Sequence, residues 1–215
     1  MKWYAFSLIS AIVMVVSPAA TQAQARCDAP RALISVDKSS SMLNGIGGGL
    51  TKWLAARMAI EEMTMAFADR VNFGLQVFPY PNRCEPGEVV IEIGDNDADT
   101  LIGGLGDPPP TGGNYTPMAE TLNAAAMVPA LLDTSRDNHL ILITDGWQWC
   151  DPYDASTRFS PVESVSSLRA LGVTVHVVGF GEGVDALTLN RAAVAAGTDL
   201  PGCDASGTDP ADPNH

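Results

Sequence analysis

Three short segments of the chain carry side chains that can bind one cation together. The first is Asp37-Lys38-Ser39-Ser40-Ser41, in which positions 37, 39 and 41 alternate and can turn toward one point. The second is 112–117 (GGNYTP), which contains Thr116, and the third is Thr144-Asp145-Gly146. Together they supply two carboxylates and three hydroxyls. These hard oxygen ligands suit magnesium, calcium or manganese, and they suit zinc or copper poorly.

The elements that must position these segments can be predicted from the pattern around them. Residues 31–37 (RALISVD) and 139–144 (HLILIT) are short apolar runs that predict buried strands, and a carboxylate stands at the end of each. Thr116-Pro117 begins a predicted helix that reaches about Leu132, with Pro at its first position. Ligands of a doubly wound sheet bind at the carboxyl ends of the strands, where the strand order reverses. If these two strands are neighbours, all three segments meet there.

The rest of the chain alternates between predicted strands and helices. Further strands are expected at 71–78, 89–93 and 173–178, and further helices from a cap at Thr51 to about Asp69, at 161–171 and at 185–196. We therefore expect an α/β domain with a Rossmann-like, doubly wound, mainly parallel sheet and helices on both faces.

Two segments carry additional local patterns, the alternating aspartates of 95–113 and one apolar face of the first predicted helix. The segment 95–113 is expected to be irregular, and its alternating Asp95, Asp97 and Asp99 lack the glycine and glutamate of a calcium loop, which favours helix capping or a solvated loop. The predicted helix after Thr51 has apolar side chains at helical spacings on one face, namely Leu50, Leu54, Met58 and Met65.

The motif Asp37-Lys38-Ser39-Ser40-Ser41 resembles the DxSxS signature of von Willebrand factor A domains, a family that includes the integrin inserted domains and the anthrax toxin receptors. Thr116 and Asp145 resemble the other two parts of that family's metal-ion-dependent adhesion site (MIDAS), in the same order along the chain. The resemblance covers about residues 30–200. It implies that Ser39, Ser41 and Thr116 bind one divalent cation directly, Mg²⁺ first, with Mn²⁺ or Ca²⁺ as alternatives. Asp37 and Asp145 would act mostly through water or hydrogen bonds.

Such a ligand set has a functional consequence. Neutral hydroxyls quench the charge of a cation less than carboxylates do, so the cation retains affinity for one more anionic oxygen. In the family this oxygen typically comes from an Asp or Glu of a protein partner. The resemblance thus implies an extracytoplasmic adhesion or recognition domain and not an enzyme. Two alternatives remain open, a metal-dependent hydrolase and a structural subunit of a surface assembly.

The sequence motifs of other enzyme classes are not found. A dinucleotide enzyme would need GxGxxG after the first strand, where this sequence has DKSSSM, and no GxSxG elbow of a serine hydrolase occurs. A metal-dependent phosphatase needs carboxylate or histidine ligands and a positioned base, whereas these ligands are mainly hydroxyls.

The chain ends where the family would add a sixth strand and a last helix. Residues 204–215 are rich in Asp, Pro and Gly and are expected to be disordered. The domain is therefore expected to span 26–203 and to lack its final strand and helix, which would leave 173–178 as an exposed edge. We expect residues 26–215 alone to be marginally stable or self-associating.

The N-terminus and the charge point to an exported protein. A basic start, an apolar run from Ala5 to Val16 and the small residues before Arg26 predict a signal peptide over 1–25, without a lipobox. The mature chain would be secreted or periplasmic, with 11 basic against 25 acidic residues and a net charge of −14. Such a surface repels nucleic acid and anionic lipid. We expect no nucleic-acid partner and no membrane span.

Four cysteines are far apart in sequence, which argues against zinc and favours two disulfides in an oxidising compartment. Cys84 follows the second strand and Cys150 the fourth, so both are expected at the end of the sheet that carries the proposed site. Cys27 and Cys203 are expected at the opposite end. Pairing within each end gives Cys84–Cys150 and Cys27–Cys203, although the first pair must arch over the first strand. A partner for Cys203 elsewhere remains an alternative.

Aromatic side chains near the site have two interpretations. Trp147 and Trp149 follow Asp145 and either pack under the loop or line the ligand surface. His139 and His176 fall within predicted strands, away from the proposed site, and are expected to be structural.

Overall fold

The computed structural model of the chain describes residues 28–206, except 114, 151, 180 and 182. The predicted signal peptide, Cys27 and residues 207–215 lie outside this part, so the predictions made for them are not tested by the structure. None of the described helices is long and apolar enough to cross a membrane.

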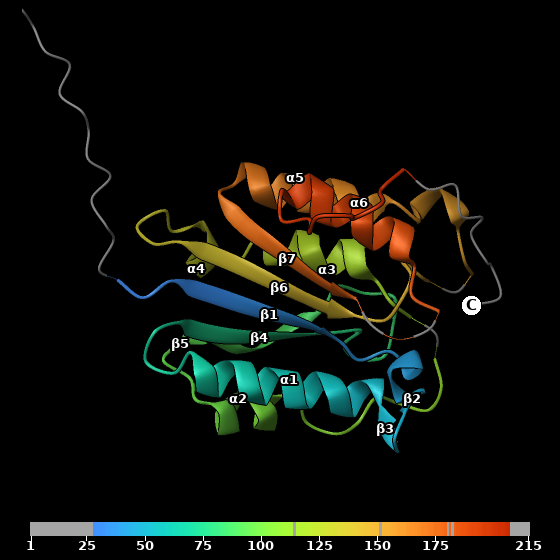
Figure 1. Cartoon of the computed structure of the whole chain (residues 1–215), viewed down its shortest axis with the longest axis horizontal. Coiled ribbons are helices and arrows are strands. Elements are labelled where there is room, and N and C mark those ends of the chain that lie inside the picture. Colours follow the sequence, from blue (N-terminus) through green and yellow to red (C-terminus); the bar gives the residue numbers. More distant parts are fainter. Residues whose placement is uncertain (1–27, 114, 151, 180, 182, 207–215) are drawn as a thin grey trace, which may run out of the picture.

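A five-stranded sheet forms the centre of the molecule (Figure 1). Its strands are β1 (Arg31–Asp37), β4 (Asn72–Phe78), β5 (Glu88–Gly94), β6 (Asn138–Thr144) and β7 (Val173–Gly179). Their order is β5-β4-β1-β6-β7, and only the β4–β5 pair is antiparallel. The chain runs from β1 out to one edge and resumes on the other side of β1 with β6. The strand order thus reverses between β1 and β6, as the prediction for the site required.

Helices cover both faces of the sheet, which confirms the predicted architecture (Figure 1). On one face lie α1 (Lys52–Ala66) and α2 (Ala98–Gly104). On the other lie α3 (Met118–Ala125), α4 (Pro129–Leu132), α5 (Ser160–Ala170) and α6 (Ala186–Ala196). The loop after β1 holds a short 3₁₀ helix (Ser40–Leu43) and a small hairpin of β2 (Gly45–Gly47) and β3 (Leu50–Thr51), and a second 3₁₀ turn spans Ala155–Thr157.

The core consists of two apolar layers separated by the sheet. Because side chains alternate along a strand, Leu33 of β1 packs with the α3, α5 and α6 side chains, whereas Ile34 packs toward α1 and α2. Because both faces of the sheet are covered, β1 is buried over almost its whole length. This strand is therefore a rigid support for the segment that follows it.

Two predictions of helical structure were wrong in part. The segment 95–113 contains α2, because the Asp97 carboxylate accepts the Thr100 amide at 2.8 Å and caps its first turn. The helix predicted from Thr116 to Leu132 divides into α3 and α4. Pro129 begins the second piece, since proline inside a helix would remove a backbone hydrogen bond but is tolerated in the first turn.

The apolar face noticed on the first helix is the solvent face of α1. Leu54, Met58 and Met65 are 43, 56 and 65% exposed, whereas Trp53 and Ile60 are buried against the sheet. Helical spacing alone does not distinguish these two faces, because both carry large apolar residues.

The position predicted for Cys203 was also wrong. Gly197 ends α6 in the left-handed conformation (φ 74°), and the Thr198 hydroxyl then donates to the carbonyl of Val175 in the edge strand β7. The chain next doubles back along α6, where Cys203 Sγ lies 3.8 Å from the carbonyl oxygen of Asn190. Cys203 therefore lies beside the first half of α6 and not at the end of the sheet opposite the site.

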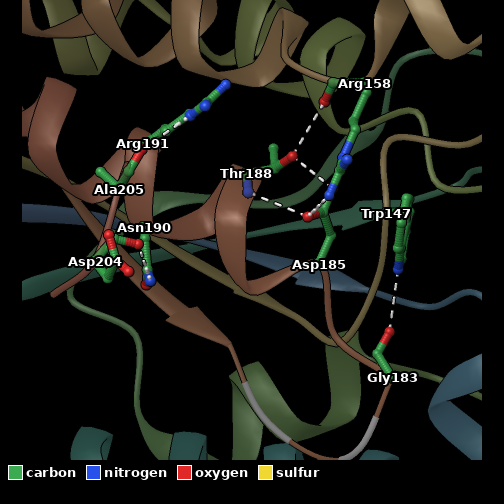
Figure 2. Close-up of polar contacts among 9 residues, drawn as sticks. All are labelled: Trp147, Arg158, Gly183, Asp185, Thr188, Asn190, Arg191, Asp204 and Ala205. Carbon is green, nitrogen blue, oxygen red and sulfur yellow. Dashed lines mark hydrogen bonds and ion pairs between the residues drawn. The ribbon is translucent and has the colours of Figure 1, made fainter. Parts of the chain in front are cut away.

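Side chains of α6 hold this returning segment in place. Asn190 donates to the Asp204 carbonyl at 2.8 Å and Arg191 to the Ala205 carbonyl at 3.1 Å (Figure 2). Cys203 forms no disulfide within the described part of the chain. Its pairing with Cys27 stays a prediction. Among the described residues β7 is the strand at this edge of the sheet.

Candidate metal centre

The first carboxylate of the site is fixed at the end of the central strand. Asp37 is fully buried, and its Oδ1 accepts the Ser39 amide at 2.8 Å, which turns the chain away from β1. Its Oδ2 accepts the Thr144 hydroxyl at 2.6 Å across the β1–β6 boundary. Asp37 thereby ties together the first and third of the three segments.

The two serines connect this loop to the second carboxylate. The hydroxyl oxygens of Ser39 and Ser41 are 2.9 Å apart, and Ser41 donates to Asp145 Oδ1 at 2.9 Å. Ser39 and Asp145 are buried, whereas Ser41 is partly exposed. Ser41 is thus the more accessible of the two hydroxyls, whereas Ser39 is buried together with the carboxylates.

Thr116 completes the set from the other side. A Cβ placed on Gly146 would lie 3.3 Å from Thr116 Cγ2 and 3.4 Å from Asp37 Oδ2, so glycine is what lets these segments approach so closely. Thr116 is 3% exposed, and its Oγ1 would lie 3.5 Å from the same Cβ. All five predicted ligands therefore converge, and their oxygen chemistry fits a hard divalent cation.

The loop before Thr116 is held by its neighbours on both sides. Ser40 donates to the Gly113 carbonyl at 2.9 Å, and Asn82 donates to the Gly112 carbonyl at 2.8 Å. Thr116 itself forms a two-way backbone bridge with Trp149, at 2.7 and 3.1 Å.

The predicted disulfide Cys84–Cys150 is present, with the two Cα atoms 5.5 Å apart. It joins the loop that carries Asn82 to the loop that carries Trp149. The two loops must pass over β1 to meet, and both contact the segment that contains Thr116, through Asn82 and Trp149.

The two neighbouring carboxyl groups of the site have different surroundings. Burial raises the pKa of Asp37 to about 7, the nearby Asp145 carboxylate adds to this, and hydrogen bonds from Thr144 and Ser39 offset it only in part. Asp145 is paired with the ammonium of Lys52, with 2.6 Å between Nζ and Oδ2.

Two residues of the site were missed from the sequence. Lys52 lies in the first turn of α1, where the helix dipole disfavours a cation, and this conflict was the available signal that an acid lies nearby. Gln148 is buried, accepts the Ala119 amide at 2.8 Å and donates to Glu120 at 2.8 Å. It thereby fixes the loop after β6 to the start of α3, and no sequence pattern indicated this.

The interpretation of Trp147 as part of a ligand surface is not supported. Its ring is 8% exposed, its Nε1 donates to the Gly183 carbonyl at 3.1 Å, and the Arg158 guanidinium lies 4.6 Å from the ring centroid (Figure 2). Trp149 is only partly buried and stacks on Tyr153 at 4.4 Å between centroids. Trp147 packs under the loop, and only Trp149 remains a candidate for the ligand surface.

The two histidines lie away from these ligands, as predicted. His139 is at the start of β6, so roughly 20 Å of extended strand separates it from Asp145. Its Nδ1 is 3.2 Å from Nε2 of His176, and the rings stack.

Without a divalent cation, we expect the protein to lose stability as the pH rises from about 5 to 7. A carboxyl whose pKa is raised from 3.8 to about 7 on folding stabilises the fold fully below pH 3.8, and this contribution is lost as the pH rises through 7. We expect a loss of about 1–3 kcal/mol attributable to Asp37. Urea unfolding in EDTA at several pH values, compared between wild type and Asp37→Asn, measures it.

The comparison isolates Asp37 because other titrating groups are the same in both proteins. The pKa of His176 is lowered by burial and by His139, which acts in the opposite direction near pH 6. If the free energy of unfolding depends on pH equally in the wild type and in Asp37→Asn, the loss of stability does not come from Asp37.

Comparison with known proteins adds the following. No family model matches the chain. The uncharacterized protein YwmC of Bacillus subtilis strain 168 is 26% identical over 169 residues, which cover 74% of this chain and 70% of YwmC. The solved structure of BatB, a conserved hypothetical protein from Bacteroides thetaiotaomicron, matches with a TM-score of 0.60 at 17% identity, over 78% of this chain and 86% of BatB.

Two further structures relate the fold to the sequence motifs. The SpRpn10 VWA domain matches with a TM-score of 0.58 at 12% identity, over 79% of this chain and 82% of that domain. Proximal thread matrix protein 1 from the mussel byssus, solved with a zinc-occupied MIDAS motif, matches with a TM-score of 0.54 at 19% identity, over 78% of this chain and 42% of the mussel protein. The chain therefore has the von Willebrand factor A fold, as its motifs predicted.

Proposed function

We propose that this domain of the von Willebrand factor A fold binds one divalent cation, Mg²⁺ in first place, and through it recognises an acidic side chain of a protein partner outside the cytoplasm. The observation that carries the proposal is the convergence of five oxygen-bearing side chains from three separate segments at the carboxyl ends of β1 and β6. These are Asp37, Ser39, Ser41, Thr116 and Asp145.

The layering of the site supports recognition through the cation. Asp37 and Asp145 are buried beneath, whereas the partly exposed Ser41 lies on the outer side. A cation held by hydroxyls at this level keeps much of its charge and faces solvent, where a carboxylate of a partner can complete its coordination. The mussel structure with zinc in its MIDAS motif shows that a protein of this fold holds a divalent cation, and this supports the assignment here.

A hydrolase is less well supported by the same geometry. Hydrolysis needs a base within hydrogen-bond reach of the attacking water. Both described histidines are remote from the site, and Asp145 is already bound to Lys52 and Ser41. We therefore propose a binding domain and not an enzyme.

Calorimetry with Mg²⁺ and Mn²⁺ tests the proposal. We expect about one cation per wild-type chain and at least a hundredfold loss of affinity for Asp37→Ala/Asp145→Ala, because both charges of the site are removed. Thr116→Ala removes a neutral ligand only, and we expect it to bind about tenfold more weakly while it keeps the fold.

The control variant Asp97→Ala/Asp154→Ala removes the same charge from exposed caps and should bind like wild type. The same proteins, immobilised, then test recognition, and a partner from the cell envelope should be retained by the wild type in Mg²⁺ and not in EDTA. Equal cation binding by wild type and the Asp37/Asp145 double variant would refute the proposal.

A further inference from the structure

A lysine lies among the proposed metal ligands. Lys52 is 4% exposed, and its Nζ is 2.6 Å from Asp145 Oδ2, whereas the other oxygen of that carboxylate accepts the Ser41 hydroxyl. An ammonium in this place loses its hydration and stands at the positive end of α1, and both effects are unfavourable. The pairing with Asp145 must offset them.

The position of this lysine is fixed by three segments of the chain. Thr51 caps α1 through a 3.2 Å bond to the Leu54 amide, and the Lys52 amide donates to the Asn44 carbonyl at 3.0 Å. A Cβ on Gly181 would lie 2.5 Å from Lys52 Cε, so the loop after β7 closes directly over the aliphatic part of the lysine. Gly181 has φ 88°, a conformation that favours glycine. The ammonium is therefore directed to Asp145 by the fold.

The neighbouring lysine is directed elsewhere. Lys38 stands between Asp37 and Ser39 in the sequence, but its Nζ donates to the Leu105 carbonyl at 2.9 Å and lies 5.8 Å from the Trp53 ring. It is partly exposed. Within the described residues, Lys52 is thus the lysine that neutralises the acids of the site.

We infer that Lys52 is a tethered cation that competes with the divalent cation for Asp145. In the metal-free protein the ammonium neutralises this carboxylate. Entry of a divalent cation breaks the Lys52–Asp145 pair and releases the ammonium, so that binding is an exchange of one cation for another. This inference rests on the proposed metal site and adds the residue that sets its affinity.

Exchange has a measurable consequence. A monovalent cation has the same charge as the ammonium that it would replace, whereas a divalent cation brings twice that charge to Asp37 and Asp145. The site is therefore selective for divalent ions, and its affinity is reduced by the free energy of the internal pair. Removing the ammonium should raise the affinity for the divalent cation, although the metal-free fold then loses stability.

Calorimetry with Mn²⁺ on Lys52→Met and on the matched Lys38→Met is the first test. Methionine keeps most of the aliphatic length and removes the charge. We expect Lys52→Met to bind at least tenfold more tightly than wild type, and Lys38→Met to stay within about twofold. Binding by Lys52→Met that is equal to or weaker than that of wild type overturns this inference and leaves the proposed metal site standing. Binding by none of the three proteins overturns both.

A second test needs no substitution at the site. The sequence contains only three lysines, and Lys2 belongs to the predicted signal peptide, so acetylated lysine side chains in peptides of the mature protein report on Lys38 and Lys52 alone. In EDTA we expect Lys52 to be protected, and with saturating Mn²⁺ we expect it to be acetylated at least fivefold faster, with Lys38 unchanged. Protection of Lys52 that persists in Mn²⁺, under conditions where calorimetry shows binding, would rule out its release.

Discussion

Replacement of Asp185 by alanine is expected to reduce the free energy of unfolding by about 3–5 kcal/mol. Asp185 is 1% exposed and receives two hydrogen bonds from Arg158, at 2.8 and 2.9 Å (Figure 2). It also caps α6 by accepting the Thr188 amide and hydroxyl. Burial alone would raise the pKa of Asp185, but these hydrogen bonds outweigh it and hold the pKa below its ordinary value. The alanine variant would take the Asp185 carboxylate away from the buried Arg158 guanidinium.

A matched control separates this ion pair from simple helix capping. Asp97 caps α2 in the same way but is exposed, so Asp97→Ala should cost only about 1 kcal/mol. Urea unfolding of both variants in EDTA gives the comparison. Asp185→Leu/Arg158→Met should be more stable than Asp185→Ala, because no charge is left unpaired. If Asp185→Ala lowers the free energy of unfolding no more than Asp97→Ala does, the buried Asp185–Arg158 pair does not stabilise the fold beyond helix capping.

This network bears on the metal site through Trp147. The indole is held between the Arg158 guanidinium and the Gly183 carbonyl, and it lies two residues after Asp145. The loop after β6 is thereby fixed to the start of α6 and to the loop after β7. These contacts hold the loop that follows Asp145.

The ligands could be predicted because each stands in a short contiguous motif next to a recognisable element. The apolar runs 31–37 and 139–144 predicted the two strands and showed that Asp37 and Asp145 stand at their ends. The rule that ligands bind where the strand order reverses predicted that these ends lie together. The groups that tune the site were not predictable in this way. Lys52, Gln148 and Arg158 act across loops that no periodic pattern describes.

The errors in the fold have the same origin. The return of the chain after Gly197 follows from hydrogen bonds of α6 side chains to backbone carbonyls, and such contacts leave no signature in sequence. By contrast the Cys84–Cys150 pair was predictable, because the two cysteines follow strands that end at the same edge of the sheet.

Loss of the Cys84–Cys150 disulfide is expected to reduce the free energy of unfolding by roughly 4 kcal/mol, by the chain-entropy relation for a closed loop of this size. The bridge spans 66 residues, and it limits the conformations of the unfolded chain over that length. Cys84→Ser/Cys150→Ser should therefore lower the midpoint of urea unfolding by this free energy divided by the m-value. The double serine variant leaves Cys203 in place, so the predicted Cys27–Cys203 pair does not enter the comparison with the wild type.

The same variant tests whether the bridge supports the cation. The two loops that it joins hold the Thr116 segment through Asn82 and Trp149, so without the bridge Thr116 is held less firmly against Gly146. We therefore expect Mn²⁺ to bind the double serine variant more weakly, and saturating Mn²⁺ to recover part of the lost stability by mass action. Non-reducing peptide mapping checks the connectivity directly. A peptide that links Cys84 to any cysteine other than Cys150, or a double serine variant as stable as the wild type, would contradict this prediction, because the stability is then not carried by a bridge between these two loops.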